Sequence, residues 1–348
     1  MGGVVSSLEC VLSSLSSSMR SSRMLALAPV LLLGACGGGG AELGEPIEPP
    51  EGWEAVGGVT QTTASEVMTR GAQGLYVAAG RAVYRSANGE DWTALAPLPA
   101  DVEAASLIEI DGQPWAGGYN NAGVYRLPAG ATAWREDASG LAGLGARTVL
   151  GLAVRGRQLF AATAGSGLYR RELDQAAGWV ADRQGIPSNL SWNVESVAEH
   201  QGRVIAGAGG NGNLYIRTGD SLTWREVAYE TFNGEALFLW SFFDDGDALL
   251  AAGNRRLYRS TDAGETWTVV FGYPRYVSRA RFAATDTAIY VMLTTSIDTR
   301  ILRSTDGGLS WNPAVENLQG VQGYDIGILQ STLFLAHQNG FWRTTLQP

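Results

Sequence analysis

The feature of this 348-residue chain that most constrains its fold is a tryptophan that returns every 39 to 45 residues. Seven tryptophans follow this spacing: Trp53, Trp92, Trp134, Trp179, Trp224, Trp267 and Trp311. A period of about 40–45 residues indicates an array in which each repeat is one small supersecondary unit. The chain is therefore expected to fold as a set of similar, neighbouring units.

Each repeat contains several short runs of the residue types that favour strands. Each repeat has a run of aliphatic and aromatic residues, for example Leu75–Val77 in one repeat and Leu249–Ala251 in another. A second run of this kind comes one turn earlier in the repeat, for example Val149–Val154. An aromatic or aliphatic residue and an arginine, as in Tyr258-Arg259, then precede the tryptophan. The repeat thus predicts four short strands with the tryptophan on the outermost one, which is the make-up of one β-propeller blade.

The last repeat is split between the two ends of the chain. Three of its strands are expected near the C-terminus, ending at Phe341–Arg343, and Trp53–Val56 can supply the fourth. This pairing also covers two sheet edges that would otherwise be open to foreign strands. Residues 53–348 are therefore predicted to form an all-β fold, a seven-bladed β-propeller of four-stranded blades in which an N-terminal strand completes the last blade.

Residues 1–35 are predicted to be a signal peptide. Arg20 and Arg23 precede an apolar run, Met24–Leu33, that is shorter than the roughly 20 residues of a membrane-spanning helix. The next residues, up to Cys36, read L-G-A-C and resemble the lipobox of bacterial lipoproteins. The resemblance implies that Cys36 carries the lipid and becomes the first mature residue. Residues 1–18 have no role in this scheme, which makes Met19 a candidate for the true start.

Residues 36–52 are predicted to be a lipidated tether, because four glycines and then several prolines follow Cys36. The protein is therefore expected to be exported and anchored by lipid in the bacterial cell envelope, in the outer membrane if the cell is Gram-negative. The alternative is an ordinary secretory signal in which the cysteine is incidental.

Composition excludes several function classes. The formal net charge is −9, whereas a protein that binds nucleic acid needs a basic face. Both cysteines, Cys10 and Cys36, precede the predicted propeller, and His200 and His337 are the only histidines. No disulfide, metal site or cofactor is therefore expected in the folded part.

Three repeats carry a sharper motif just before the tryptophan. It reads S-T-D-A-G-E-T-W at Ser260–Trp267, S-T-D-G-G-L-S-W at Ser304–Trp311 and, one residue shorter, S-A-N-G-E-D-W at Ser86–Trp92. These segments resemble the Asp-box, or bacterial neuraminidase repeat, of sialidase-like propellers. In such a turn Asp or Asn bonds the local backbone and glycine accepts a positive φ. We assign a structural role to the motif residues Ser86, Asn88, Trp92, Ser260, Asp262, Gly264, Trp267, Ser304, Asp306, Gly308 and Trp311.

The resemblance leaves an enzymatic function open without favouring it. Sialidases imply six blades and an Arg-Ile-Pro segment, and the nearest string here is Gly185–Pro187. Xyloglucanase-like enzymes place paired carboxylates between two propellers, and this chain has room for one. Glu195, Asp244 and Asp325 are candidate carboxylates for acid/base hydrolysis, but we interpret them as solvated or channel-lining.

The photosystem II assembly and stability factor family is the closer match in size. Its members are exported, single seven-bladed Asp-box propellers that bind partner proteins, and the resemblance covers residues 53–348 in architecture and repeat motif. The favoured hypothesis is a monomeric, membrane-anchored, non-catalytic scaffold or assembly factor for a protein partner in the envelope. The alternative is a carbohydrate-binding or glycoside-hydrolase (sialidase-like) propeller with a glycan ligand.

The ligand face of a propeller is built by loops that lead into the inner strands and by loops that join the two middle strands. Aromatic residues and arginine, which dominate protein interfaces, are predicted on those loops. The predicted ligand-binding residues are Tyr119, Trp192, Trp240, Tyr276, Arg279 and Tyr324, with Asn120, Asn121, Asn211 and His337 on loops between middle strands. The alternative is that the rings only fill the central channel.

Overall fold

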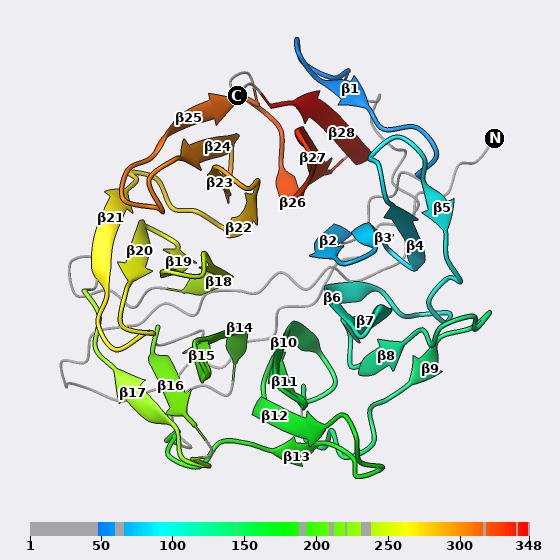
Figure 1. Cartoon of the computed structure of the whole chain (residues 1–348), viewed down its shortest axis with the longest axis vertical. Coiled ribbons are helices and arrows are strands. Elements are labelled where there is room, and N and C mark those ends of the chain that lie inside the picture. Colours follow the sequence, from blue (N-terminus) through cyan, green and yellow to red (C-terminus); the bar gives the residue numbers. More distant parts are fainter. Residues whose placement is uncertain are drawn as a thin grey trace, which may run out of the picture. The chain divides into compact units, whose positions relative to one another are not determined.

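The computed structural model describes residues 48–59, 66–143, 145–187, 193–208, 212–219, 221–230, 238–315, 318–338 and 340–346. In this part of the chain, 28 strands form seven antiparallel four-stranded sheets. The sheets are arranged as blades around a central axis (Figure 1). The seven-bladed β-propeller predicted from the tryptophan period is confirmed. These residues include no helix of the length and hydrophobicity needed to cross a membrane.

The two inner strands of each blade are the longest and most regular. The innermost strands are β2 (Glu66–Gly71), β6 (Ala104–Ile110), β10 (Val149–Arg155), β14 (Val194–His200), β18 (Leu239–Asp244), β22 (Arg279–Ala284) and β26 (Gly323–Leu329). The second strands are β3 (Gly74–Ala79), β7 (Gln113–Gly118), β11 (Gln158–Thr163), β15 (Arg203–Ala208), β19 (Leu249–Gly253), β23 (Ile289–Thr294) and β27 (Thr332–His337).

The third and outer strands complete each blade. The third strands are β4 (Ala82–Ser86), β8 (Val124–Arg126), β12 (Gly167–Glu172), β16 (Leu214–Thr218), β20 (Arg256–Ser260), β24 (Thr299–Ser304) and β28 (Gly340–Thr345). The outer strands are β5 (Thr93–Ala94), β9 (Arg135–Glu136), β13 (Val180–Ala181), β17 (Arg225–Val227), β21 (Thr268–Gly272), β25 (Asn312–Val315) and β1 (Glu54–Ala55). We number the blades from 1 (β2–β5) to 7 (β26–β28 with β1).

The ring is closed by the two ends of the described chain, as the split repeat predicted. Strand β1 pairs with β28 in the register Glu54↔Arg343 and Ala55↔Trp342 (Figure 1). The Val56 N–H extends the pairing by donating to the Phe341 carbonyl at 2.9 Å. The Arg343 guanidinium also donates to the Glu54 carboxylate at 3.1 and 3.2 Å.

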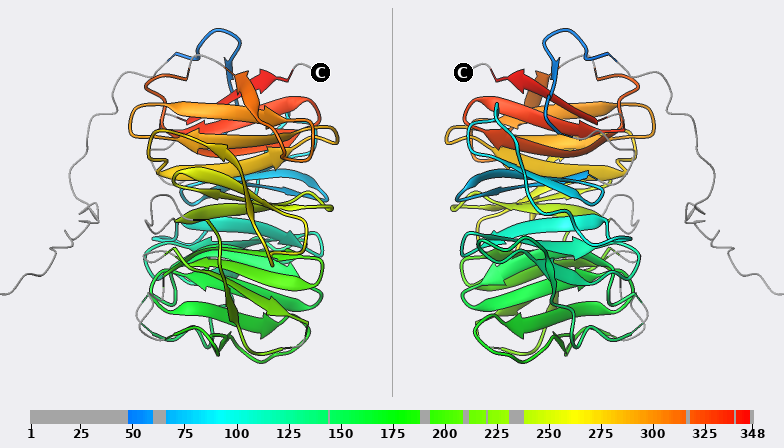
Figure 2. Two further views of the ribbon diagram at one scale, coloured as in Figure 1. Left: turned by 90° about the vertical axis from the view of Figure 1, so that its left-hand side faces the viewer. Right: turned by 90° about the vertical axis from the view of Figure 1, so that its right-hand side faces the viewer.

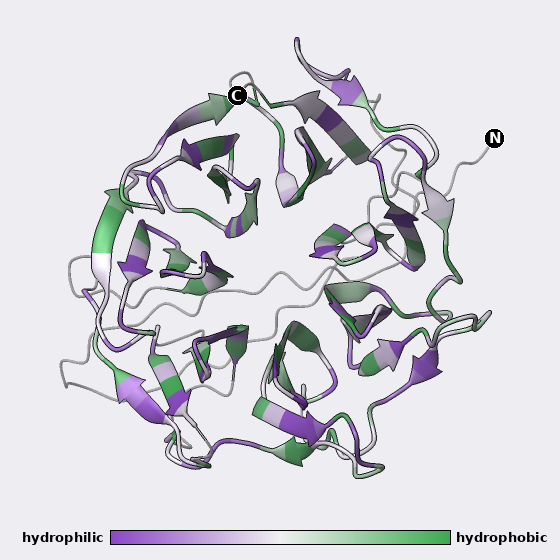
Figure 3. Ribbon diagram, in the orientation of Figure 1, coloured by the Kyte–Doolittle hydropathy of each residue, from purple (hydrophilic) through white to green (hydrophobic). Residues whose placement is uncertain are grey.

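The core lies between neighbouring blades and is not a single central mass. Second strands such as β11 and β23 are buried along almost their whole length, because each is covered by a blade on both faces. Outer strands such as β9 and β17 carry exposed charged residues and are coloured as hydrophilic in Figure 3. The side views show the strands crossing the thickness of the ring, so that the loops lie on two opposite faces (Figure 2).

The tryptophans lie one residue before the outer strands, whereas the sequence placed them on those strands. Trp267, for example, precedes β21 and packs with residues of blades 4 and 5. At this position the indole packs between two sheets, and the hydrogen bonds of the outer strand begin only at the residue after the tryptophan. Six of the seven tryptophans are buried; Trp92 is partly exposed and meets Phe334 edge-on with ring centroids 5.6 Å apart.

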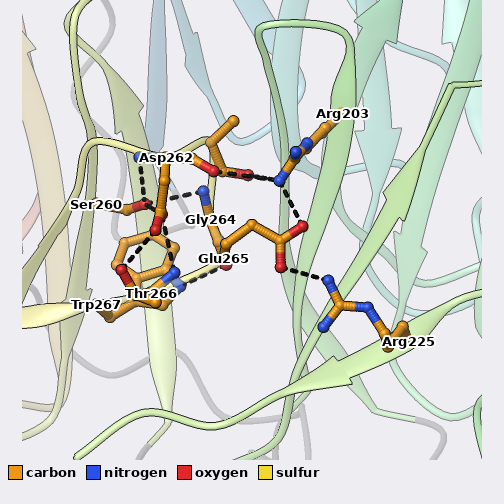
Figure 4. A network of polar contacts seen from close by, with 9 residues as sticks. Arg203, Arg225, Ser260, Asp262, Gly264, Glu265, Thr266 and Trp267 are labelled. Carbon is orange, nitrogen blue, oxygen red and sulfur yellow. Dashed lines mark hydrogen bonds and ion pairs between the residues drawn. The ribbon is translucent and has the colours of Figure 1, made fainter.

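We call Ser86–Trp92, Ser260–Trp267 and Ser304–Trp311 the box turns. In the second of them the Ser260 hydroxyl donates to Asp262 at 2.8 Å and accepts the Gly264 N–H at 2.9 Å (Figure 4). The Asp262 carboxylate accepts the Thr266 N–H at 2.8 Å. Gly264 has φ of +87°, a conformation that costs glycine little and other residues more. The same bonds recur at Ser304–Trp311, so in both turns the serine hydroxyl and the aspartate carboxylate are satisfied by residues of the turn itself.

Candidate functional site

The predicted ligand face is defined by the antiparallel order of the strands. Loops from an outer strand to the next inner strand share one face of the ring with loops that join the second and third strands. The box turns join third and outer strands and therefore lie on the opposite face. We call these the mouth face and the box face; most predicted ligand-binding residues belong to the mouth face, around the end of the central channel.

Irregular pairing marks the first residues of five inner strands. In each, the register shifts around the second residue, so that one residue has no partner on the second strand. Such bulges change the direction of a side chain and are frequent beside functional sites. The residues concerned are Ala105, Leu150, Glu195, Trp240 and Tyr324. Three large side chains of the mouth thus occupy equivalent positions in different blades.

Arg279 links two of the other predicted ligand-binding residues, Tyr324 and Tyr119. Its guanidinium lies over the Tyr324 ring, 4.8 Å from the centroid, which is the geometry of a cation–π contact. Burial, and then repulsion from Arg281, lowers the pKa of Arg279, while Tyr119 and Tyr324 act in the opposite direction. Tyr119 comes from blade 2, whereas Arg279 and Tyr324 come from blades 6 and 7. The structure therefore brings Tyr119, Arg279 and Tyr324 together at the mouth.

Arg281 lies deeper and is surrounded by carboxylates from other blades. Burial raises the pKa of Asp325, and Arg281 opposes this rise. Asp325 also accepts the Met68 N–H of blade 1 at 2.8 Å, which fixes blade 7 to blade 1. Burial likewise raises the pKa of Glu195 on β14, and again Arg281 is the opposing charge. Both candidate carboxylates are therefore within electrostatic reach of one arginine.

Glu66 is a third carboxyl group at this level and was not predicted. It is the first residue of β2 and only 2% exposed. Burial raises its pKa to about 9, and the backbone N–H of His337 offsets only part of the rise. The negative form of Glu66 would also raise the pKa of Tyr324, which places the two groups within electrostatic reach. At neutral pH Glu66 is therefore a neutral acid beside the mouth.

A group of aromatic rings lies beside the channel, at the start of blades 5 and 6. Trp240 stacks on Phe238 with ring centroids 5.5 Å apart and an angle of 13° between the planes. Its indole N–H donates to the Val277 carbonyl at 3.0 Å, which ties it to the loop that carries Tyr276. Tyr276 is 45% exposed, and the Arg255 guanidinium lies 5.9 Å from its ring centroid. Tyr276 is thus the accessible end of this group.

Other predicted residues have different positions. Trp192, Asn211 and Cys36 lie outside the described residues. Asn120 and Asn121 are exposed on the β7–β8 loop. His337 is not a loop residue: it is the last residue of β27, fully buried, with its ring 3.8 Å from that of Trp342. The prediction failed because β27 extends to His337, which pairs with Gly323 on one side and Gly340 on the other.

Asp244, the remaining candidate carboxylate, lies away from the mouth and pairs with His200. Asp244 ends β18 with an exposed carboxylate that meets His200 Nδ1 at 2.8 Å, on the box-face side of the inner strands. It therefore does not join Glu195 and Asp325 at the mouth.

Sequence reasoning missed Glu66, Phe238, Arg255 and Arg281. Arg281 could have been found, because it follows Arg279 by two residues on one strand and so shares its side. Phe238 lies before β18 and Trp240 is the bulge residue of that strand, so a simple strand alternation would not have paired them. The burial of Glu66 carries no local signal in the sequence.

The mouth offers arginine donors, aromatic faces and one neutral carboxylic acid. Such a set can hold a ligand by charge-assisted hydrogen bonds and by stacking. In the described ranges no three His, Cys, Asp or Glu side chains are grouped so that they could hold a metal ion.

No protein-family model matches the chain, and no curated protein matches it in sequence. Solved structures do match in fold. The extracellular domain of the putative one component system BT4673 from B. thetaiotaomicron superimposes with a TM-score of 0.65 and 12% identity, over 84% of this chain and 40% of that chain. This chain therefore corresponds to less than half of that one.

Two solved structures match over nearly their whole length. YCF48 bound to D1 peptide has a TM-score of 0.61 and 18% identity, over 87% of this chain and 99% of that chain. Virginiamycin B lyase from Staphylococcus aureus has a TM-score of 0.65 and 15% identity, over 85% and 98%. These identities establish a shared propeller fold. The fold serves both a protein that binds a peptide and an enzyme, so it does not decide the function of this chain.

Proposed function

We propose that this protein is a lipid-anchored, extracytoplasmic propeller that binds a protein partner on its mouth face without catalysing a reaction. The observation that carries the proposal is the cation–π pair of Arg279 and Tyr324; the loop that leads into the Arg279 strand also carries the exposed ring of Tyr276. Arginine and large aromatic residues supply most of the binding energy in protein interfaces. A preformed cation–π pair also costs little conformational entropy when a partner binds.

The anchor is proposed from the sequence L-G-A-C that ends at Cys36. The fold is compatible with an exported protein, since one similar structure is an extracellular domain. We expect Cys36→Ala to move the protein from the membrane fraction to the soluble fraction, which fractionation with acyl labelling measures. If the variant still sediments with membranes and the wild type takes up no acyl label, the anchor is wrong.

The binding proposal is tested with variants that change the surface and spare the core. Tyr276→Ala removes an exposed ring of the mouth face, and Leu309→Ala, at a residue 58% exposed in a box turn, is the matched control. We expect Tyr276→Ala to weaken capture of the partner from native envelope extracts by about tenfold and Leu309→Ala to leave it unchanged. Both variants should unfold at the wild-type temperature, because exposed side chains contribute little stability.

A carbohydrate ligand is the second candidate, and the stacked rings of Phe238 and Trp240 favour it, since aromatic faces also bind sugars. The carboxyl groups of Glu195 and Asp325 leave a hydrolase as a variant of this candidate. A glycan array with the same two variants separates the classes. Specific glycan binding that Tyr276→Ala abolishes, together with no captured protein, would replace the protein-binding proposal.

A further inference from the structure

In two of the three cases, a third-strand arginine holds the box turn of the next blade. On β28 of blade 7, Arg343 donates to the Gly89 carbonyl at 3.5 Å and forms an ion pair with Glu90, both in the blade 1 turn. On β20 of blade 5, Arg259 donates to the Gly307 carbonyl of the blade 6 turn at 2.8 Å. The turn is therefore bound through a backbone carbonyl and, in blade 1, through a carboxylate as well.

The second-strand residue opposite each arginine supports the glycine of the same turn. Phe334 pairs with Arg343, and a Cβ built on Gly89 would lie 3.0 Å from the Phe334 ring. Leu250 pairs with Arg259, and a Cβ on Gly308 would lie 2.6 Å from Leu250. Arginine and apolar neighbour thus form a seat for a glycine-containing turn.

Blade 5 uses a variant of this seat, in which two arginines of blade 4 hold the turn. Arg203 donates to the Asp262 carbonyl at 3.1 Å and to the Glu265 carboxylate at 2.7 Å. Arg225 binds the other oxygen of Glu265 at 2.5 Å (Figure 4). A carbonyl and a carboxylate of one turn are again the groups recognised.

Blade 6 has the two residues of such a seat, but its neighbour, blade 7, has no box turn to occupy the seat. Tyr290 and Arg303 pair in the register of Phe334 and Arg343. In blade 7 the third strand is β28 and the outer strand is β1, and no turn joins them because they come from opposite ends of the described chain. A cavity of about 740 Å³ lies there, which we call the closure notch, lined among others by Tyr290, Arg303, Thr332, Thr344 and Leu346.

Two polar side chains of the closure notch have no hydrogen-bond partner in the described chain, although only 2% of Tyr290 is exposed. Within the described chain the Arg303 guanidinium makes no hydrogen bond or ion pair, and its Nε is buried. The Tyr290 hydroxyl, which interacts electrostatically with Arg303, makes no hydrogen bond there either. The other arginines of this third-strand series all have polar partners: Arg85, Arg126, Arg170, Arg217, Arg259 and Arg343.

Among the charged side chains that line the closure notch, Arg303 is the cation without an ionic partner in the described chain, so we expect it to select the ligand. Glu54 and Glu90 also line the cavity, and both pair with Arg343. Glu51 is exposed at the surface, where solvent and salt screen its repulsion. A second cavity of about 540 Å³ shares Tyr290, Arg303 and Leu346 with the notch, so the groove has room for residues that flank a turn.

We propose that the closure notch binds a hairpin turn of a partner protein that carries a glycine followed by an acidic residue. The turn would be held as a box turn is held, with a backbone carbonyl and the carboxylate on Arg303 and the Tyr290 hydroxyl. This surface is on the box face and is independent of the mouth, so it stands or falls separately from the proposed function.

The blade 1 box turn supplies the probe. A synthetic peptide with residues 86–92, closed into a ring by a terminal disulfide, is titrated into the full chain. We expect binding that Arg303→Gln weakens about tenfold or more, because a charge-assisted hydrogen bond pair is lost. Changing the glutamate of the peptide to glutamine should weaken binding to the wild type and have little further effect on Arg303→Gln.

The matched control is Arg259→Gln, which alters an equivalent seat whose turn is in place. It should lower the unfolding temperature and leave peptide binding unchanged, whereas Arg303→Gln should leave the unfolding temperature unchanged. The proposal is overturned if the wild type does not bind the peptide at millimolar concentration, or if the two variants lose binding equally. Concentration-dependent self-association that only Arg303→Gln abolishes would assign the notch to a second copy of this chain.

Discussion

The box face and the mouth face are made from the same seven blades but stabilised in opposite ways. In a box turn such as Ser260–Trp267 the serine and aspartate side chains find their partners within eight residues, and one neighbouring blade holds the remaining polar groups. The mouth combines side chains from blades 1, 2, 4, 6 and 7, and burial shifts the pKa values of Glu66, Glu195 and Asp325 upward. The difference indicates that repeated residues here serve the fold, whereas the residues that break the repeat form the candidate site. Groups with strongly shifted pKa values often cluster at functional sites.

The largest effect is expected from removing the segment that closes the ring. Deleting residues 51–58 removes β1 and the buried side chains of Trp53 and Val56. We expect a loss of more than about 5 kcal/mol, because truncation of a single buried aromatic side chain costs about 3–5 kcal/mol. Denaturant unfolding measures it, with deletion of residues 37–44 of the predicted tether as the control of equal length. A closure deletion that melts within a degree or two of the wild type would contradict the role of β1.

A smaller loss of stability is expected at a single repeated tryptophan. Trp267 is 8% exposed, and Trp267→Ala should cost roughly 3–5 kcal/mol. Trp92→Ala should cost less, because Trp92 is partly exposed. Chemical denaturation ranks the two variants, and partner capture below the transition should stay intact in both. If a variant of unchanged stability no longer captured the partner, binding would lie on the box face, and the contrast between the two faces would be wrong.

The smallest effect on stability, and one of opposite sign, is expected at Glu66. Its folded-state pKa of about 9 lies above the ordinary value of 4.5, so its contribution is complete below pH 4.5 and is lost as pH rises toward 9. Glu66→Gln should therefore stabilise the protein at pH 7, by on the order of 1–3 kcal/mol. Unfolding at pH 5, 7 and 9 measures this. Glu51→Gln, at an exposed carboxylate, is the control and should change nothing; a destabilised Glu66→Gln at pH 9 would show that the anion is required.

The fold was predictable because its signals are local and repeated. A tryptophan near each outer strand and a glycine with positive φ in each box turn are readable within one repeat, and the unmatched strand near Trp53 reveals the closure. The one-residue error in placing the tryptophans arose because the sequence does not show where hydrogen bonding of an outer strand begins.

The site was only partly predictable. Tyr119, Arg279 and Tyr324 were assigned from their loops and do meet. Glu66 was missed, because its burial depends on packing between blades 1 and 7, which no local pattern reports. The bulges that direct Glu195 and Trp240 are equally invisible in the sequence, since an extra residue in a strand leaves its composition unchanged.

The closure of the ring has a mechanical consequence. Strand β1 contributes only two residue pairs to β28, and the predicted lipid tether leads directly into it. A pull between the membrane and a bound partner would load these pairs before any complete blade. We expect β1 to detach first and to uncover the edge of β28, so that tension would present an open strand edge while six blades stay folded.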